Sequence, residues 1–229
     1  MRKPIDAWMN FHAVAILVGA AVAVTIESPV PLAATAFGSF CYFLACCYTT
    51  ATAEIRFGQM GNWITGIRLI LILIVVVLMD EFSPYLVFTF FAVNLLLDVA
   101  DGYVARKLGQ ASYFGAVFDQ EVDAFFVMSA CLYFNLESGF APWILIPGTL
   151  RYAFRVTVWI CETTEFTETR RSILARLAGL NFVLLTVAVI LPPNTQFGLL
   201  VLSTGLFVAS FSSSFRELLK TSNDYPLSR

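Results

Sequence analysis

The chain alternates long apolar runs with short polar breaks from one end to the other. Eight of the runs approach the ~20 residues that a helix needs to span a bilayer. They cover residues 11–27, 32–52, 62–80, 83–107, 112–136, 140–162, 171–191 and 196–215. The breaks contain turn-forming residues such as Ser28-Pro29 and Pro192-Pro193-Asn194. The pattern therefore predicts an all-α fold, a polytopic membrane bundle of eight transmembrane helices.

Composition supports a membrane protein and excludes other classes. Of the 229 residues, 59% are hydrophobic and only 13% are charged. The net charge of −2 and the scattered basic residues argue against a nucleic-acid partner. His12 is the only histidine, and the spacing of the five cysteines does not suggest a zinc site or a disulfide framework. Chemistry that depends on histidine or cysteine is therefore disfavoured.

The basic residues predict an orientation, because cytoplasmic loops are enriched in Lys and Arg. If the N-terminus is cytoplasmic, the four opposite connectors contain no Lys or Arg and carry only Glu27, Asp80, Glu81 and Glu137 as charged residues. Both termini are then expected in the cytoplasm.

Three arginines, Arg68, Arg151 and Arg155, fall well inside predicted spans. A charge at membrane depth is costly, so each is either a functional residue or the partner of a carboxylate.

Four aspartates form the most informative pattern. Asp98 and Asp101 share a helix face at the end of one span, and Asp119 and Asp123 are four residues apart at the start of the next. A short turn separates the two spans, so we expect antiparallel neighbours whose four carboxylates converge beneath the cytoplasmic surface. Glu121 points away from this stripe and is not assigned to the site.

A divalent cation would offset the repulsion among four such acids, and Mg²⁺ prefers oxygen ligands. The alternative, solvated acids at helix ends, fits poorly because strongly apolar sequence such as Leu95-Leu96-Leu97 adjoins them. Gly102 and Gly115 would permit close approach of a ligand to the backbone. Arg106 lies beside the acids in sequence and could pair with phosphate oxygens.

The segment from Asp98 to Asp123 resembles the signature of the CDP-alcohol phosphotransferase family, D-x2-D-G-x2-A-R-x8-G-x3-D-x3-D, at every specified position. The stretch Asn62-Trp-Ile-Thr65-Gly-Ile-Arg68 is similar to the N-x-[LI]-T-x2-R stretch of the same family. The resemblance covers residues 61–215 as six core helices. It implies a six-helix domain over residues 57–229 and an N-terminal extension, residues 1–56, with two further transmembrane helices of no assigned chemistry.

The resemblance implies attack by an alcohol on the β-phosphate of a CDP-linked donor, with release of CMP. It assigns two ions, Mg²⁺ or Mn²⁺, to Asp98, Asp101, Asp119 and Asp123, with Asp123 also the general base. Further residues are expected to bind the CDP donor: Asn62, Thr65, Arg68, Asp98, Gly102, Ala105, Arg106 and Gly115. It also implies phospholipid biosynthesis in the bacterial inner membrane, with a cytoplasmic active site, and a possible homodimer.

The resemblance suggests CDP-diacylglycerol as the donor and a small polar alcohol as the acceptor, because most bacterial-type members of this size use such a pair. Two arginines add an argument about the acceptor. Arg151 and Arg155 are four residues apart on one helix face and could bind an acceptor phosphate. This favours glycerol 3-phosphate first and inositol phosphate second, over unphosphorylated serine or choline. Two observations oppose it: the arginines could instead contact Glu162 or the acid cluster, and residues 119–123 depart from the D-P-V-A-D form of glycerophosphate-using members.

A metal-ion transporter is the main alternative from another class, because acids within a membrane also build cation pathways. A transporter should place acids near the bilayer midplane or on both sides. Here the predicted acids gather at one face, which favours the enzyme.

Overall fold

The structure, a computed structural model, describes residues 2–49, 59–107, 112–161 and 171–224. It contains eight α-helices and, among the described residues, no strand. The helices are α1 (Arg2–Thr25), α2 (Val30–Thr49), α3 (Met60–Leu78), α4 (Pro84–Lys107), α5 (Tyr113–Leu136), α6 (Ile146–Ile160), α7 (Arg171–Ala188) and α8 (Pro193–Asp224). A short 3₁₀ turn, η1 (Pro142–Leu145), precedes α6. The all-α prediction is confirmed.

The helix starts follow the turn signals in the sequence. Pro84 and Pro193 each occupy the first position of a helix, where the missing N–H of proline costs nothing. Ser112 caps α5, and its Oγ accepts a hydrogen bond of 3.1 Å from the backbone N–H of Gly115. This cap fixes the start of the helix that carries Asp119 and Asp123.

Within the described residues, five helices are long and apolar enough to cross a membrane: α1, α2, α3, α4 and α8. The other three predicted spans also form helices, with a different composition. Helix α5 carries Asp119, Glu121 and Asp123, α6 is only 15 residues long and carries two arginines, and the apolar part found in α7 is Gly179–Ala188. Long apolar helices of this number define an integral membrane protein.

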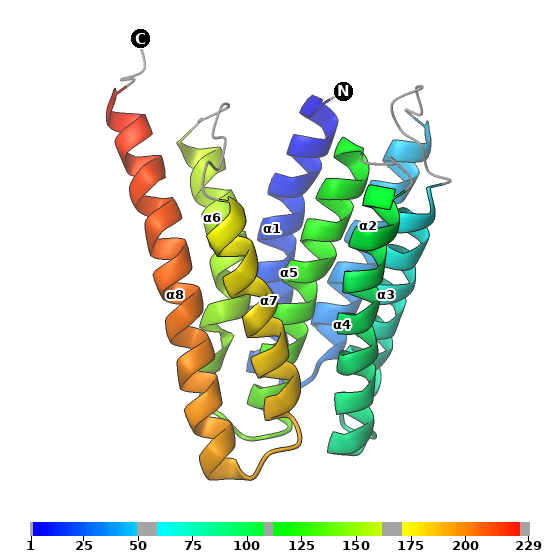
Figure 1. Ribbon diagram of the computed structural model, residues 1–229, viewed down its shortest axis with the longest axis vertical. Coiled ribbons are helices and arrows are strands. Elements are labelled where there is room, and N and C mark those ends of the chain that lie inside the picture. The colour runs from blue at the N-terminus through cyan, green and yellow to red at the C-terminus, as the bar shows by residue number, and fades with distance from the viewer. Residues whose placement is uncertain (1, 50–58, 108–111, 162–170, 225–229) are drawn as a thin grey trace.

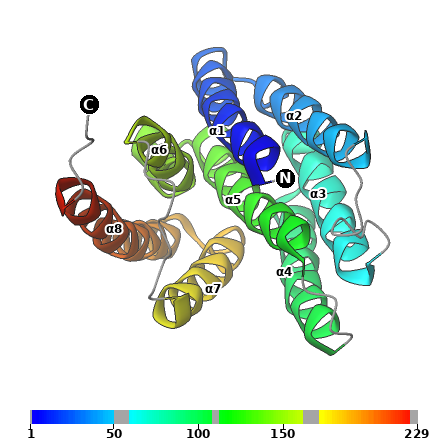
Figure 2. The ribbon, with the colours of Figure 1, turned by 90° about the horizontal axis from the view of Figure 1, so that it is seen from above.

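Helix α5 lies in the middle of the bundle (Figure 2). Helix α3 packs against both α4 and α5, and α1 packs against α2, α5 and α6. Helices α4 and α5 meet through long side chains, for example the rings of Phe91 and Phe126, whose centroids are 5.0 Å apart. The starting end of α1 and the final end of α8 lie at the same end of the bundle (Figure 1), as an even number of spans requires.

Candidate metal centre and adjoining cavity

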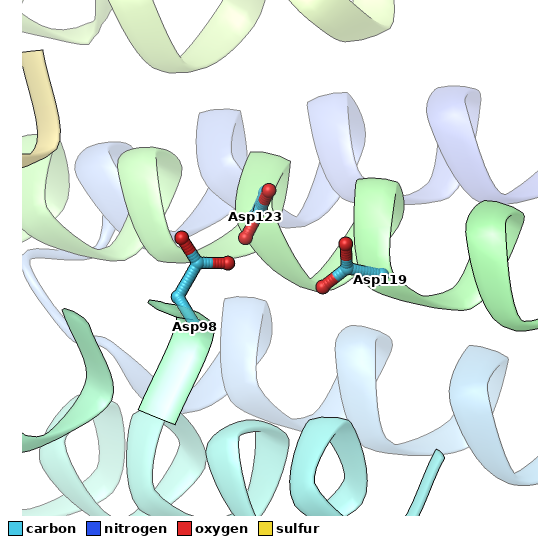
Figure 3. A group of neighbouring side chains, drawn as sticks. All are labelled: Asp98, Asp119 and Asp123. Carbon is cyan, nitrogen blue, oxygen red and sulfur yellow. The ribbon is translucent and has the colours of Figure 1, made fainter. Parts of the chain in front are cut away.

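The aspartates meet between the second half of α4, which carries Asp98 and Asp101, and the first half of α5, which carries Asp119 and Asp123. One carboxylate oxygen from each of Asp98, Asp119 and Asp123 lies within 4.8 Å of the others. Figure 3 shows these three side chains directed toward a common space between α4 and α5. Their side chains are 27%, 40% and 27% exposed, so the centre is shielded but open on one side. The predicted convergence of the two helices is therefore present.

Arg68 of α3 lies at the centre of this acidic group. Its Nη1 is 2.9 Å from Asp101 Oδ2 and 2.6 Å from Asp119 Oδ1. Its Nη2 is 2.9 Å from Asp98 Oδ1 and also pairs with Asp123. The Arg68 side chain is only 1% exposed. One buried guanidinium thus contacts all four predicted metal ligands.

This arrangement revises one step of the sequence argument. There, a divalent cation was the counter-charge that the four acids required, and Arg68 was assigned to the nucleotide. The structure shows that Arg68 pairs with carboxylates, which was the alternative considered for an arginine within a span, and that its partners are all four aspartates of the cluster.

Two neighbours hold Arg68 and Asp101 in place. The Asn94 side-chain amide donates to the backbone carbonyl of Arg68 at 3.0 Å, and Arg68 Nε donates to Asn94 Oδ1 at 3.5 Å. The Thr65 hydroxyl shares its one proton between Asp101 Oδ2, at 3.3 Å, and the Gly61 carbonyl, at 3.1 Å. Sequence reasoning missed Asn94, although it precedes Asp98 by four residues and so shares its helix face.

The carboxylates fit a divalent cation by their chemistry. Hard ions such as Mg²⁺ and Mn²⁺ take oxygen ligands, and Asp98, Asp119 and Asp123 offer three oxygens that could converge on one ion. Asp101 is the most buried of the four aspartates, 6% exposed, and its Oδ2 is already engaged by Arg68 and Thr65. Within the described residues, three aspartates are therefore close enough together to bind one ion, and the fourth, Asp101, is more deeply buried.

A cavity of about 160 Å³ adjoins the aspartates. Several residues predicted to bind the nucleotide line it together with Asp101 and Asp119: Asn62, Thr65, Gly102 and Gly115. A Cβ added to Gly115 would lie 2.7 Å from Asn62 Oδ1, so a side chain there would displace the Asn62 amide. The motif residues of α3, α4 and α5 thus surround one space beside the metal ligands.

Two further predicted nucleotide contacts, Ala105 and Arg106, lie in α4, but their side chains are outside the described residues.

Arg151 and Arg155 of α6 have other partners. Arg151 Nη2 is 2.9 Å from Glu121 Oε1, and Arg155 Nη2 is 3.5 Å from Asp6 Oδ1 of α1. Neither carboxylate was among the partners that the sequence analysis considered. Glu162, which was considered, lies outside the described residues. The structure therefore brings these two arginines to the α1, α5 and α6 side of the bundle, and it does not join them to the aspartates through the ion pairs observed.

The fold and the site define a polytopic helical membrane protein with an acidic centre enclosed by α3, α4 and α5. The family model for CDP-alcohol phosphatidyltransferase matches residues 59–211. The chain belongs to this family of enzymes, which confirms the resemblance seen in the sequence.

Two relatives are named CDP-diacylglycerol–glycerol-3-phosphate 3-phosphatidyltransferase. The protein from Cereibacter sphaeroides is 34% identical over 92 residues, which cover 40% of this chain and 41% of the relative. The protein from Haemophilus influenzae is 32% identical over 90 residues, which cover 37% of this chain and 48% of the relative. The matches thus span less than half the length of these relatives. No solved structure matches the chain.

Proposed function

We propose that this chain is a divalent-metal-dependent transferase that moves a phosphatidyl group from CDP-diacylglycerol to the hydroxyl of a small polar acceptor and releases CMP. The observation that carries the proposal is the convergence of Asp98, Asp119 and Asp123 beside a cavity lined by the family motif. Family membership gives the class of reaction. It also favours the transferase over a metal-ion transporter.

The aspartates would divide the chemistry between them. Asp98, Asp101, Asp119 and Asp123 would hold Mg²⁺ or Mn²⁺, in one or two sites. A bound divalent ion neutralises phosphate charge and favours in-line displacement at phosphorus. Asp123 would take the proton of the acceptor hydroxyl. The acceptor oxygen then bonds to the β-phosphorus of the donor, and the bond from that phosphorus to the CMP oxygen breaks.

The cavity would receive part of the CDP group. Its volume of about 160 Å³ is smaller than the ~300 Å³ at which typical ligand pockets begin, so it suits one portion of a nucleotide such as the base. Gly115 and Gly102 leave room there, and Asn62 and Thr65 offer polar groups. Arg106 stays a predicted phosphate contact.

Glycerol 3-phosphate is the acceptor that we favour, because the names of both relatives specify it. Inositol phosphate is second, and serine or choline is the alternative. The acceptor-binding role of Arg151 and Arg155 stays a prediction. Their observed pairing with Glu121 and Asp6 gives it no support.

We further propose that the aspartates face the cytoplasm of a bacterial cell, at the inner membrane. The absence of Lys and Arg from the four opposite connectors supports this orientation. A homodimer stays a prediction.

An acceptor panel tests the function. Purified protein in nanodiscs is given CDP-diacylglycerol, Mg²⁺ and, in turn, glycerol 3-phosphate, inositol phosphate, serine or choline, and CMP release is measured. We expect release with one acceptor, and at least a ~100-fold loss for Asp123→Asn, the effect of losing a general base. Asp80→Asn, in the connector before α4, is the matched control and should retain full activity. Release that Asp123→Asn leaves unchanged would refute the role of Asp123, and Mn²⁺ flux into liposomes without CMP release would favour the transporter.

A further inference from the structure

Glu121 lies on the back of α5, away from the metal centre. It stands two residues after Asp119 and two before Asp123. A helix turns by about 100° per residue, so Glu121 points roughly 180° from the direction midway between these aspartates. Its side chain is only 3% exposed. A carboxylate buried in this way requires a partner on the far side of the helix.

Arg151 of α6 is that partner, with Nη2 at 2.9 Å from Glu121 Oε1. The two helices approach closely at Gly148, where an added Cβ would lie 2.8 Å from the Cα of Met128. This approach is possible only without a side chain at residue 148. It sets the separation of α5 and α6 at a point three residues before Arg151 on α6 and seven residues after Glu121 on α5.

Helix α1 covers this junction. His12 of α1 and Tyr152 of α6 are both fully buried, with ring centroids 5.9 Å apart, and Glu121 and Arg151 are charged neighbours of both rings. Among the described residues, His12 Nε2 and the Tyr152 hydroxyl have no hydrogen-bond partner. The junction is therefore a polar cluster enclosed by three helices, and α1 comes from the extension to which the sequence assigned no chemistry.

We propose that Glu121 and Arg151 are positioning residues, whose ion pair fixes the rotation of α5 and so aims Asp119 and Asp123 at Asp98. Two arginines then hold α5 from opposite faces, the buried Arg68 at the front and the partly exposed Arg151 at the back. This inference rests on the metal centre proposed above.

The rotation of α5 matters because metal coordination tolerates little displacement. A carboxylate lies about 6 Å from the helix axis, so a rotation of only about 10° moves it by about 1 Å. Metal–ligand distances vary by about 0.2 Å. Even a small rotation would separate the α5 ligands from Asp98 on α4, which does not move with them.

A double-mutant cycle tests the proposal. Glu121→Gln, Arg151→Gln and the double variant are purified, and Mn²⁺ affinity is measured by electron paramagnetic resonance alongside thermal unfolding. Each single change should weaken Mn²⁺ binding about 10-fold, as loss of an orienting partner does at other metal sites. The double variant should be weaker than the wild type but no worse than either single variant, because it leaves no buried charge unpaired.

Gln196→Ala is the matched control for a general loss of stability. Gln196 donates a buried hydrogen bond of 3.0 Å to the Ala188 carbonyl, away from α5. The Gln196→Ala variant should have a lower unfolding temperature and the Mn²⁺ affinity of the wild type. The positioning role would be overturned if Glu121→Gln and Arg151→Gln bind Mn²⁺ as tightly as the wild type. It would also be overturned if Gln196→Ala loses as much Mn²⁺ affinity as they do. If Glu121→Gln does not fold, the double variant replaces it, and wild-type Mn²⁺ affinity in the double variant would likewise overturn the positioning role. Wild-type protein that binds no Mn²⁺ would contradict the metal centre itself, and with it this inference.

Discussion

Replacement of Arg68 by Gln removes the one guanidinium that contacts all four aspartates. The contact with Asp101 is a buried pair, with side chains 1% and 6% exposed, and breaking such a pair costs about 3–5 kcal/mol. The other three aspartates are 27–40% exposed, so each adds only about 0–1 kcal/mol. We therefore expect Arg68→Gln to lower the free energy of unfolding by ~4 kcal/mol. In a protein of this size, that lowers the unfolding temperature by about 8–16 °C.

Divalent metal should reduce the difference in stability between the wild type and Arg68→Gln. In the wild type, an ion must compete with Arg68 for Asp98, Asp119 and Asp123, whereas in Arg68→Gln the carboxylates have no competing cation. An ion at 100 times its dissociation constant stabilises a protein by about 2.7 kcal/mol. The variant should gain more than the wild type from the same Mg²⁺ or Mn²⁺ concentration, and the gap should shrink by about half.

The assay is thermal unfolding of protein in detergent, followed by tryptophan fluorescence, in EDTA and in saturating Mg²⁺. Arg155→Gln is the control, because its pair is longer, at 3.5 Å, and more exposed. It should shift the unfolding temperature by no more than about 4 °C. Two results would show that Arg68 is not the counter-charge of the cluster. One is an unfolding temperature of Arg68→Gln in EDTA that falls no further than that of Arg155→Gln. The other is a difference between Arg68→Gln and the wild type that Mg²⁺ leaves unchanged.

Three further changes have defined outcomes. Gly115→Ala places a Cβ 2.7 Å from Asn62 Oδ1, so the apparent KM for the CDP donor should rise while the unfolding temperature changes little; an unchanged KM would contradict a role for this close approach. Gly148→Ala pushes on the Met128 backbone at 2.8 Å and should cost about 1–3 kcal/mol of stability by overpacking, seen as a lower unfolding temperature. Desolvation at the end of α5, together with the nearby Asp80 carboxylate, raises the pKa of Glu137, so its ionisation opposes folding as pH rises. Glu137→Gln should therefore raise the unfolding temperature at pH 8 but not at pH 4, and equal shifts at both would contradict this cause.

The sequence could predict the helices because the bilayer restricts length and composition. The predicted span 62–80 differs by only two residues at each end from Met60–Leu78. The face of each aspartate followed from helical spacing alone, and so did the direction of Glu121.

Contacts between distant segments could not be predicted in the same way. Arg68 meets Asp101, Asp119 and Asp123 across 33, 51 and 55 residues of chain, and helical periodicity does not specify which helix lies beside which. For the same reason, the partners of Arg151 and Arg155 were not predicted. Their charges were evident in the sequence, but the packing of α1 and α5 against α6 decides which carboxylates they meet.

Asp101 and Asp119 belong to two sites at once, since each contacts Arg68 in the acidic cluster and also lines the cavity. Occupation of one site must therefore change the free energy of binding at the other. Thermodynamic linkage makes this change reciprocal. If a divalent ion tightens the hold on CMP by some factor, CMP tightens the hold on the ion by the same factor. Under the proposed function, the free metal concentration would therefore set how tightly the enzyme binds its product CMP.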